Sequence, residues 1–133
     1  MSDLESPSFK REAIVVITRD MAPFAPEEQL GEYKLKRWTW YEKQGVISRS
    51  SEIIDDKRGI VRMKIEDYYA EMLFVTIEAY PEGLPWSLKF IKTKLDPDVG
   101  DILRDEGRDL NGLMEKERKL FLQQSEPTED IPG

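Results

Sequence analysis

The sequence contains no cysteine and no histidine among its 133 residues. Without cysteine, the chain cannot form disulfides, use a thiolate nucleophile or ligate an iron–sulfur cluster. Without histidine, it cannot carry a Ser-His-Asp triad or an imidazole metal site. Long apolar runs are also missing, since no window approaches the roughly 18 residues of a membrane span. These absences exclude the commonest catalytic centres, and we expect neither a metal nor a cofactor.

Negative charge predominates, because 20 Lys and Arg stand against 27 Asp and Glu, which gives a formal net charge of −7. A general nucleic-acid binder needs a basic excess for its phosphate contacts. Hydrophobic residues make up 39% and charged residues 35% of the chain, as in globular domains with charge-rich surfaces. We therefore expect a cytoplasmic, non-enzymatic protein that binds other proteins, and neither nucleic acid nor a membrane.

The length suffices for about one domain. Residues 1–12 are polar and contain Pro7, which predicts a flexible arm. Residues 123–133 are acidic and contain prolines, which predicts a flexible tail. The remaining residues, 13–122, are expected to form a single domain.

Four segments have the character of short strands. A β-branched run predicts a buried strand over residues 13–18. Alternating apolar and basic residues over 33–38 predict a strand with one face in water. Two short apolar runs, 51–55 and 60–64, flank a turn that ends at Gly59 and predict a β-hairpin.

Helix signals are more local. Thr39 with Glu42 three residues later has the spacing of a capping box and predicts a short helix over 39–45. Another short helix is expected to open at Pro85-Trp86-Ser87. Asp96 before Pro97 is a typical helix start.

The longest helical periodicity begins at Ile65 and predicts a central helix over 65–79. A helical pair is expected over 97–122, in which Gly107 marks a kink or a close contact. The fold class is then α+β, with a small antiparallel sheet of three or four strands packed against the central helix and this pair. The expected core comprises Ile14, Val16, Leu35, Ile60, Ile65, Met72, Leu73, Ile77, Phe90, Ile102, Leu103, Leu110 and Leu113.

Two clusters of charged residues each allow two interpretations. Asp96, Asp98 and Asp101 have a spacing that would suit Mg²⁺ or Ca²⁺ and a metal-dependent hydrolase, but helix N-termini also favour carboxylates, and we prefer this second interpretation. The basic and aromatic residues over 34–43 could contact nucleic acid in a small regulator. The overall charge favours instead a strand-to-helix corner with solvated basic side chains.

Aromatic side chains are the best candidates for partner binding, because large aromatic residues are typical interface anchors. Two adjacent tyrosines at the start of the central helix cannot both face one core. The candidate partner-binding residues are Trp38, Trp40, Tyr41, Tyr68, Tyr69 and Trp86.

A resemblance rests on the order of several stretches. Residues 33–47 read YKLKRWTWYEKQGVI, with basic residues, two tryptophans and a Glu-Lys pair before an isoleucine. A short β segment, a helix beginning with tyrosines, a Val-Gly-x-x-Leu-like element and a Leu-Asn-x-Leu element before a charged run follow, at residues 60–65, 66–73, 95–103, 110–113 and 115–119. In this order the chain resembles, over roughly residues 33–122, the small tail assembly chaperones of long-tailed bacteriophages and related archaeal viruses.

The resemblance implies a non-catalytic function. Such chaperones bind the long, aggregation-prone tape-measure protein, keep it soluble and are displaced when tail-tube subunits polymerise around it. The implied partners are therefore a tape-measure protein and a tail-tube protein, in the cytoplasm of a host cell. A structural virion component of the tail, neck or baseplate, or a small cytoplasmic protein-interaction module, is the alternative, and self-association stays open.

The acidic tail generates a prediction. If it recruits the tube subunit by charge, replacing Glu126, Glu129 and Asp130 with Gln, Gln and Asn weakens that recruitment, because the attraction is lost while side-chain size is kept. Titration of the tube subunit in a binding assay measures the effect. Unchanged affinity would contradict a role for the tail.

Overall fold

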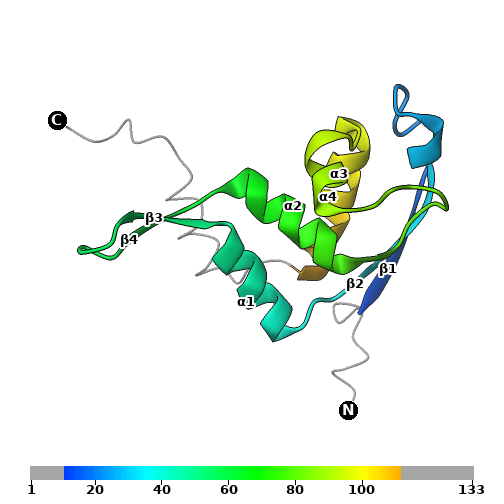
Figure 1. The fold of residues 1–133 in the computed structure, drawn as a ribbon. Helices are drawn as coiled ribbons and strands as arrows, with labels where there is room; N and C mark the ends of the chain where they lie inside the picture. The colour runs from blue at the N-terminus through cyan, green and yellow to red at the C-terminus, as the bar shows by residue number, and fades with distance from the viewer. Residues whose placement is uncertain (1–10, 112–133) are drawn as a thin grey trace, which may run out of the picture.

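The computed structural model describes residues 11–111, which form helices and two antiparallel sheets, so the predicted α+β class is confirmed (Figure 1). The predicted arm, up to residue 10, the expected core residue Leu113 and the predicted tail lie outside the described residues. Within 11–111, no helix combines the length and the apolar character that crossing a membrane requires.

The larger sheet has the order β1-β2-β5, formed by β1 (Glu12–Ile17), β2 (Gly31–Lys36) and β5 (Ile77–Ala79). The first two were predicted, and β5 was not. The central helix was expected to reach residue 79, but it ends at Thr76, and Ile77 adopts extended angles and pairs with Leu35. The apolar Ile77 also fits the helical periodicity of the preceding residues. The switch from helix to strand is therefore visible only from its pairing with β2.

The buried face of β1 differs from the expectation. Val15 and Ile17 are buried, whereas the predicted core residues Ile14 and Val16 are 60% and 54% exposed. Residues Ala13 to Ile17 are all apolar, so the sequence has no polar alternation that would distinguish the two faces. The choice is made by the helices, which cover one face of the sheet.

The helices stack on that face in layers. The long helix α4 (Pro97–Asn111) packs against β1 and β2 and also against α2 (Ile65–Thr76). Helices α1 (Trp40–Arg49) and α3 (Leu88–Thr93) pack against α2 in turn. Gly107 permits the close approach of α4 to α2, because a Cβ at this position would lie only 3.0 Å from Met72 Cε. The close contact, rather than a kink, is therefore what this glycine provides.

Side-chain caps fix three helix starts. Thr39 and Glu42 form the predicted capping box, although α1 runs on to Arg49. Desolvation opposes the charged form of Glu42, but hydrogen bonds from Lys36 and Thr39 outweigh it and lower the pKa of that carboxyl. Ser87 caps α3 and Asp96 caps α4, where the Asp96 carboxylate accepts from the Asp98 amide at 2.9 Å.

A separate hairpin, β3 (Ser51–Asp55) with β4 (Ile60–Met63), extends away from the helices and the larger sheet (Figure 1). The hairpin was predicted, and Gly59 closes its turn with the expected positive φ, 70°. Its placement was not predicted, because Ile60 was expected in the core and is 41% exposed. The other expected core residues that the structure describes are buried or half-buried: Leu35, Ile65, Met72, Leu73, Ile77, Phe90, Ile102, Leu103 and Leu110.

Two buried amide side chains fasten α4 to the segment around β2. Before β2, Gln29 donates to the Lys94 carbonyl at 3.0 Å and accepts from the Asp96 amide at 2.8 Å. After β2, Asn111 accepts from the Trp38 amide at 2.8 Å and donates to the Lys36 carbonyl at 3.1 Å. Strand and helix are therefore joined at both ends and run in the same direction.

Asn111→Ala tests this joint. We expect it to lower the free energy of unfolding by about 2–4 kcal/mol, because it leaves the Trp38 amide and the Lys36 carbonyl without partners in a buried place. Urea denaturation gives the measurement. The control is Asp109→Ala on the exposed side of the same turn, expected within about 0.5 kcal/mol of wild type. Equal effects of the two substitutions would contradict the role of Asn111.

Candidate protein-binding surface

Two of the six candidate aromatic residues lie in the core. Trp38 is 9% exposed and Tyr68 is 3% exposed. Their rings meet edge to face, with centroids 6.3 Å apart. This contact closes the corner between β2, α1 and α2, so both rings stabilise the fold and neither presents a face to a partner.

Trp86 and Tyr69 are half-buried. Trp86 stacks on Tyr80 at 5.4 Å and contacts the rings of Tyr33 and Phe90, so it completes an aromatic cluster beside β2 and α3. Its indole N–H is buried without a hydrogen-bond acceptor among the described residues. Tyr69 carries the Arg104 guanidinium 5.7 Å from its ring centroid.

Trp40 and Tyr41 are the candidates that the structure leaves open to solvent. They occupy the first turn of α1 and are 73% and 81% exposed. The capping box at Thr39 fixes where this turn starts, so both residues have a defined place on the surface. Of the six predicted residues, these two have the exposure that a partner-binding anchor needs.

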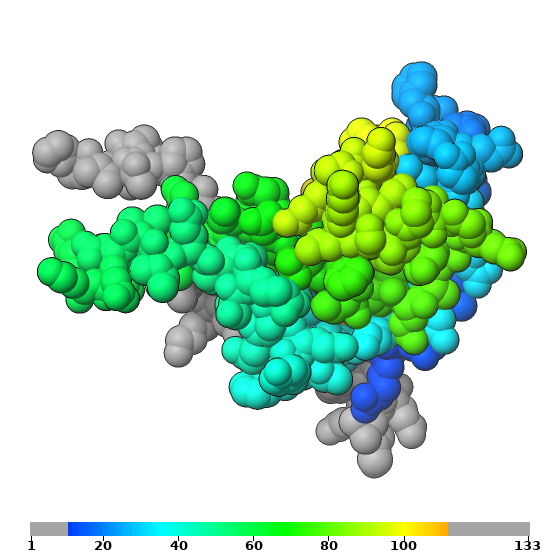
Figure 2. Space-filling view, in the orientation of Figure 1, coloured from blue at the N-terminus to red at the C-terminus, as the bar shows by residue number. Residues whose placement is uncertain are grey.

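The sequence did not single out the aliphatic surface of the β3–β4 hairpin. Ile53 is 66%, Ile54 50%, Ile60 41% and Val61 38% exposed. Successive strand residues point to opposite faces, so these two adjacent pairs place aliphatic side chains on both faces of the hairpin. In the space-filling view the hairpin extends from the body as a narrow arm (Figure 2). These adjacent aliphatic pairs could have predicted the exposed surface from the sequence. A hairpin with aliphatic side chains on both faces cannot bury both of them unless another element covers each face.

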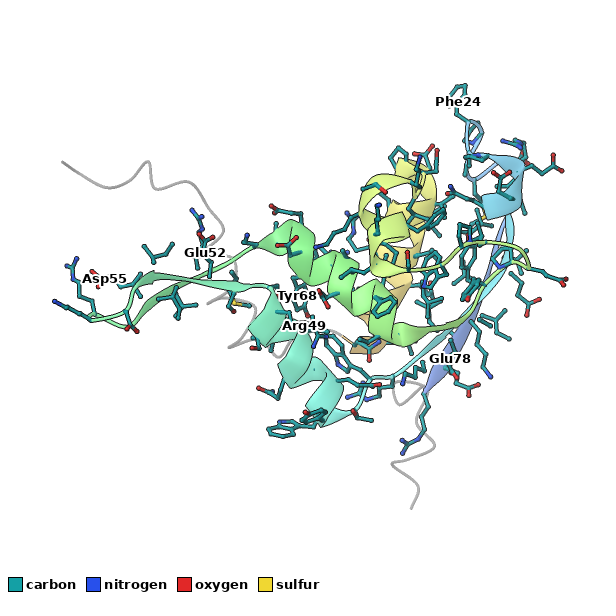
Figure 3. The ribbon with its side chains drawn as sticks, in the orientation of Figure 1. Phe24, Arg49, Glu52, Asp55, Tyr68 and Glu78 are labelled. Carbon is teal, nitrogen blue, oxygen red and sulfur yellow. The ribbon has the colours of Figure 1, made fainter. Side chains whose placement is uncertain are left out.

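Ion pairs hold the hairpin in shape. Arg62 donates to Glu52 across the strands at 2.9 Å, and this hydrogen bond lowers the pKa of the Glu52 carboxyl. Asp55 pairs with Arg58 at the tip, at 3.8 Å. At the base, the Lys64 amide donates to the Ser50 carbonyl at 2.7 Å. Figure 3 shows Glu52 near the base of this arm and Asp55 at its far end. The aliphatic side chains are thus presented on an ordered support.

A groove of about 410 Å³ opens between α2, α3 and α4. Leu73, Ile91 and Leu95 line it with apolar atoms. Two ion pairs stand at its rim, with Lys92 at 3.3 Å from Asp67 and Arg104 at 3.2 Å from Asp101. The groove is therefore an apolar depression bordered by charged side chains.

Two of the three carboxylates that were weighed as metal ligands serve other purposes in the structure. Asp96 caps α4 and Asp101 pairs with Arg104. Within residues 11–111, no three acidic side chains come together in a way that could hold a metal ion. The geometry agrees with the helix-start interpretation that the sequence favoured.

The basic stretch before α1 is also engaged within the fold. Lys34 pairs with Glu12 at 3.5 Å and Lys36 with Glu42 at 2.9 Å. The Arg37 guanidinium donates to the Leu110 carbonyl at 2.7 Å. Side chains held in this way do not form an open row of positive charge for phosphates.

Comparison with known proteins adds no further constraint. No family model, curated protein sequence or solved structure matches the chain.

The difference between the buried Trp38 and the exposed Trp40 and Tyr41 can be tested by substitution. We expect Trp38→Ala to lower the free energy of unfolding by about 3–5 kcal/mol, since it empties a core position. The double substitution of Trp40 and Tyr41 by Ala should leave that free energy within about 1 kcal/mol, because both rings already face water. Guanidinium denaturation followed by far-UV circular dichroism compares them. A large loss from the double variant would show that the two rings serve the fold.

Proposed function

We propose that the chain is a tail assembly chaperone: a non-catalytic protein that binds the tape-measure protein in the host cytoplasm and keeps it soluble during tail assembly. The observation that carries the proposal is the β3–β4 hairpin, which holds four aliphatic residues in solvent on both of its faces.

The hairpin has the physical character of a binding element. A two-stranded hairpin is marginally stable alone in water and gains from any surface that covers its apolar side chains. Covering apolar surface contributes roughly 25 cal/mol per Å². Since the strands are already paired and linked by the Glu52–Arg62 ion pair, little ordering is left to oppose binding.

The exposed aromatic pair extends the same surface. Trp40 and Tyr41 begin α1, and α1 leads through Ser50 directly into β3. Ten helical residues span about 15 Å, so the aromatic pair and the base of the hairpin stand about that far apart along α1. An elongated apolar partner could contact both. A surface of this small size favours reversible binding, which suits a client that is later handed over.

The charge of the chain supports a role in keeping a client soluble. The net charge of −7 is carried by a small protein, so complexes coated with it repel one another. The apolar binding elements and the repelling charge act together, because the first holds the client and the second keeps loaded complexes apart.

As far as residue 111, the stretches that carry the resemblance to tail assembly chaperones lie in successive elements of the fold. Residues 33–47 cover most of β2, the Trp38 corner and most of α1. Residues 60–73 cover β4 and the first part of α2, and residues 95–103 begin α4. The motif that includes Trp40 and Tyr41 thus contributes part of the proposed binding surface, and the later motifs supply the helices behind it.

Co-expression of the tagged chain with the neighbouring genes of its native operon tests the proposal. We expect a long helical protein to co-purify, and we expect this chain to be missing from mature particles. Ile53→Lys combined with Val61→Lys should reduce the recovered partner at least about tenfold, because two charges would have to be desolvated at the contact.

Phe24→Ser is the matched control. Phe24 is 89% exposed and lies in a loop far from the hairpin tip at Asp55 (Figure 3). Its removal should leave partner recovery unchanged. Equal loss with the control would contradict the hairpin assignment. Presence of the chain in mature particles would contradict a chaperone and favour a structural component of the virion.

A further inference from the structure

The strand β1 forms an edge of the larger sheet, because β2 is its one neighbour among residues 11–111. Natural edge strands are usually protected by short length, bulges, prolines or lysines. The opposite edge, β5, has three residues and pairs irregularly with β2. In contrast, β1 has six residues, Glu-Ala-Ile-Val-Val-Ile, in unbroken register. It contains no proline, lysine or bulge, and its one charged residue, Glu12, stands at its first position.

The hydrogen-bond pattern shows which backbone groups face away from β2. The Arg37 amide donates to the Arg11 carbonyl at 2.9 Å, in line with the β1–β2 register. In an antiparallel ladder, every second residue bonds to the same neighbour. Ala13, Val15 and Ile17 therefore bond to β2, and the N–H and C=O groups of Glu12, Ile14 and Val16 point to the free edge.

The same residues carry the exposed side chains of the strand. Ile14 and Val16 are 60% and 54% exposed, while Val15 and Ile17 between and beyond them are buried. An added strand would thus satisfy the free backbone groups of Ile14 and Val16 and also pack against their aliphatic side chains. A fourth strand added at this edge would gain both the backbone hydrogen bonds and the cross-strand side-chain contacts.

The strand is complementary to itself. If two copies pair antiparallel with Val15 on the two-fold axis, Ile14 of each copy lies opposite Val16 of the other. Within one copy, Ile14 pairs with Lys34 and Val16 with Glu32. Over the four central strands each row then runs Lys34, Ile14, Val16, Glu32, so the aliphatic pair is flanked by one charge of each sign. A register centred on Ile14 would instead place Lys34 on both sides of the pair.

We propose that the free edge of β1 is a dimerisation site, where a second copy of this chain pairs antiparallel about Val15 to give one six-stranded sheet. Two edges of about 20 Å bury less than the roughly 1,200 Å² of a standard stable interface. The dimer is therefore weak and depends on protein concentration. Salt strengthens it, because each copy carries the same net charge of −7. The inference rests on the sheet and is independent of the client.

Sedimentation equilibrium of the full chain, from about 1 µM to about 1 mM, tests the proposal. The wild-type mass should rise from monomer toward dimer. Ile14→Pro should weaken dimerisation at least about tenfold, since it removes an N–H that points away from β2 and edge strands tolerate proline. Ile14→Lys, which keeps the backbone intact, should have the same effect. Thermal unfolding confirms that each variant is folded.

Ile53→Lys is the matched control, because Ile53 is similarly exposed, at 66%, but lies in the hairpin. It should dimerise like the wild type. Hydrogen exchange adds a residue-specific readout. The Ile14 and Val16 amides should become protected as concentration rises, while the Val15 amide is protected throughout.

Any one of the following outcomes would overturn the proposal. The wild type could remain monomeric across the whole range. The dimer could persist in both Ile14 variants, or form without protecting the Ile14 and Val16 amides. Finally, a wild type that stays monomeric while Ile14→Lys loses the co-purified client would assign this edge to the client instead of a second copy.

Discussion

The fold depends on the joint between α4 and the segment around β2. Gln29 and Asn111 are 3% and 1% exposed, and each uses both its donor and its acceptor on backbone groups of the other element. Buried amides are costly unless they are paired, so these bonds define one alignment of helix and strand. Leu35 and Leu103 then become inaccessible to solvent. Tyr33, whose hydroxyl donates to the Gln29 carbonyl at 2.7 Å, adds a further link, and burial raises its pKa.

This arrangement separates a rigid body from the surfaces proposed to bind. Sheet, α4 and α2 share one core, whereas the β3–β4 hairpin forms its own sheet and the first turn of α1 faces solvent. Arg49 on α1 donates to the nearly buried carboxylate of Glu71 on α2 at 2.7 Å, just before β3 begins. The hairpin is thereby anchored at its root, and its apolar residues can be covered or uncovered without changing the core.

What the sequence could predict follows from the range of each interaction. The capping box at Thr39, the turn at Gly59 and the helix start at Asp96 involve residues within four positions of one another, and all three are present. The buried face of β1, the strand β5 and the outward position of Ile60 depend on elements far along the chain, so local patterns could not reveal them. Trp38 and Trp40 illustrate the same limit at the candidate site, because two positions in sequence separate a core ring from an exposed one.

The joint at Asn111 also has a consequence for the order in which the chain can fold. Asn111 bonds to groups 73 and 75 positions earlier, at Trp38 and Lys36. Contacts of such separation carry a loop-closure cost and tend to form late. During synthesis, β2 and the hairpin leave the ribosome well before α4 does. The inner face of the sheet consequently has no cover until the last helix of the body arrives, and that interval is when the nascent chain is most open to misassembly.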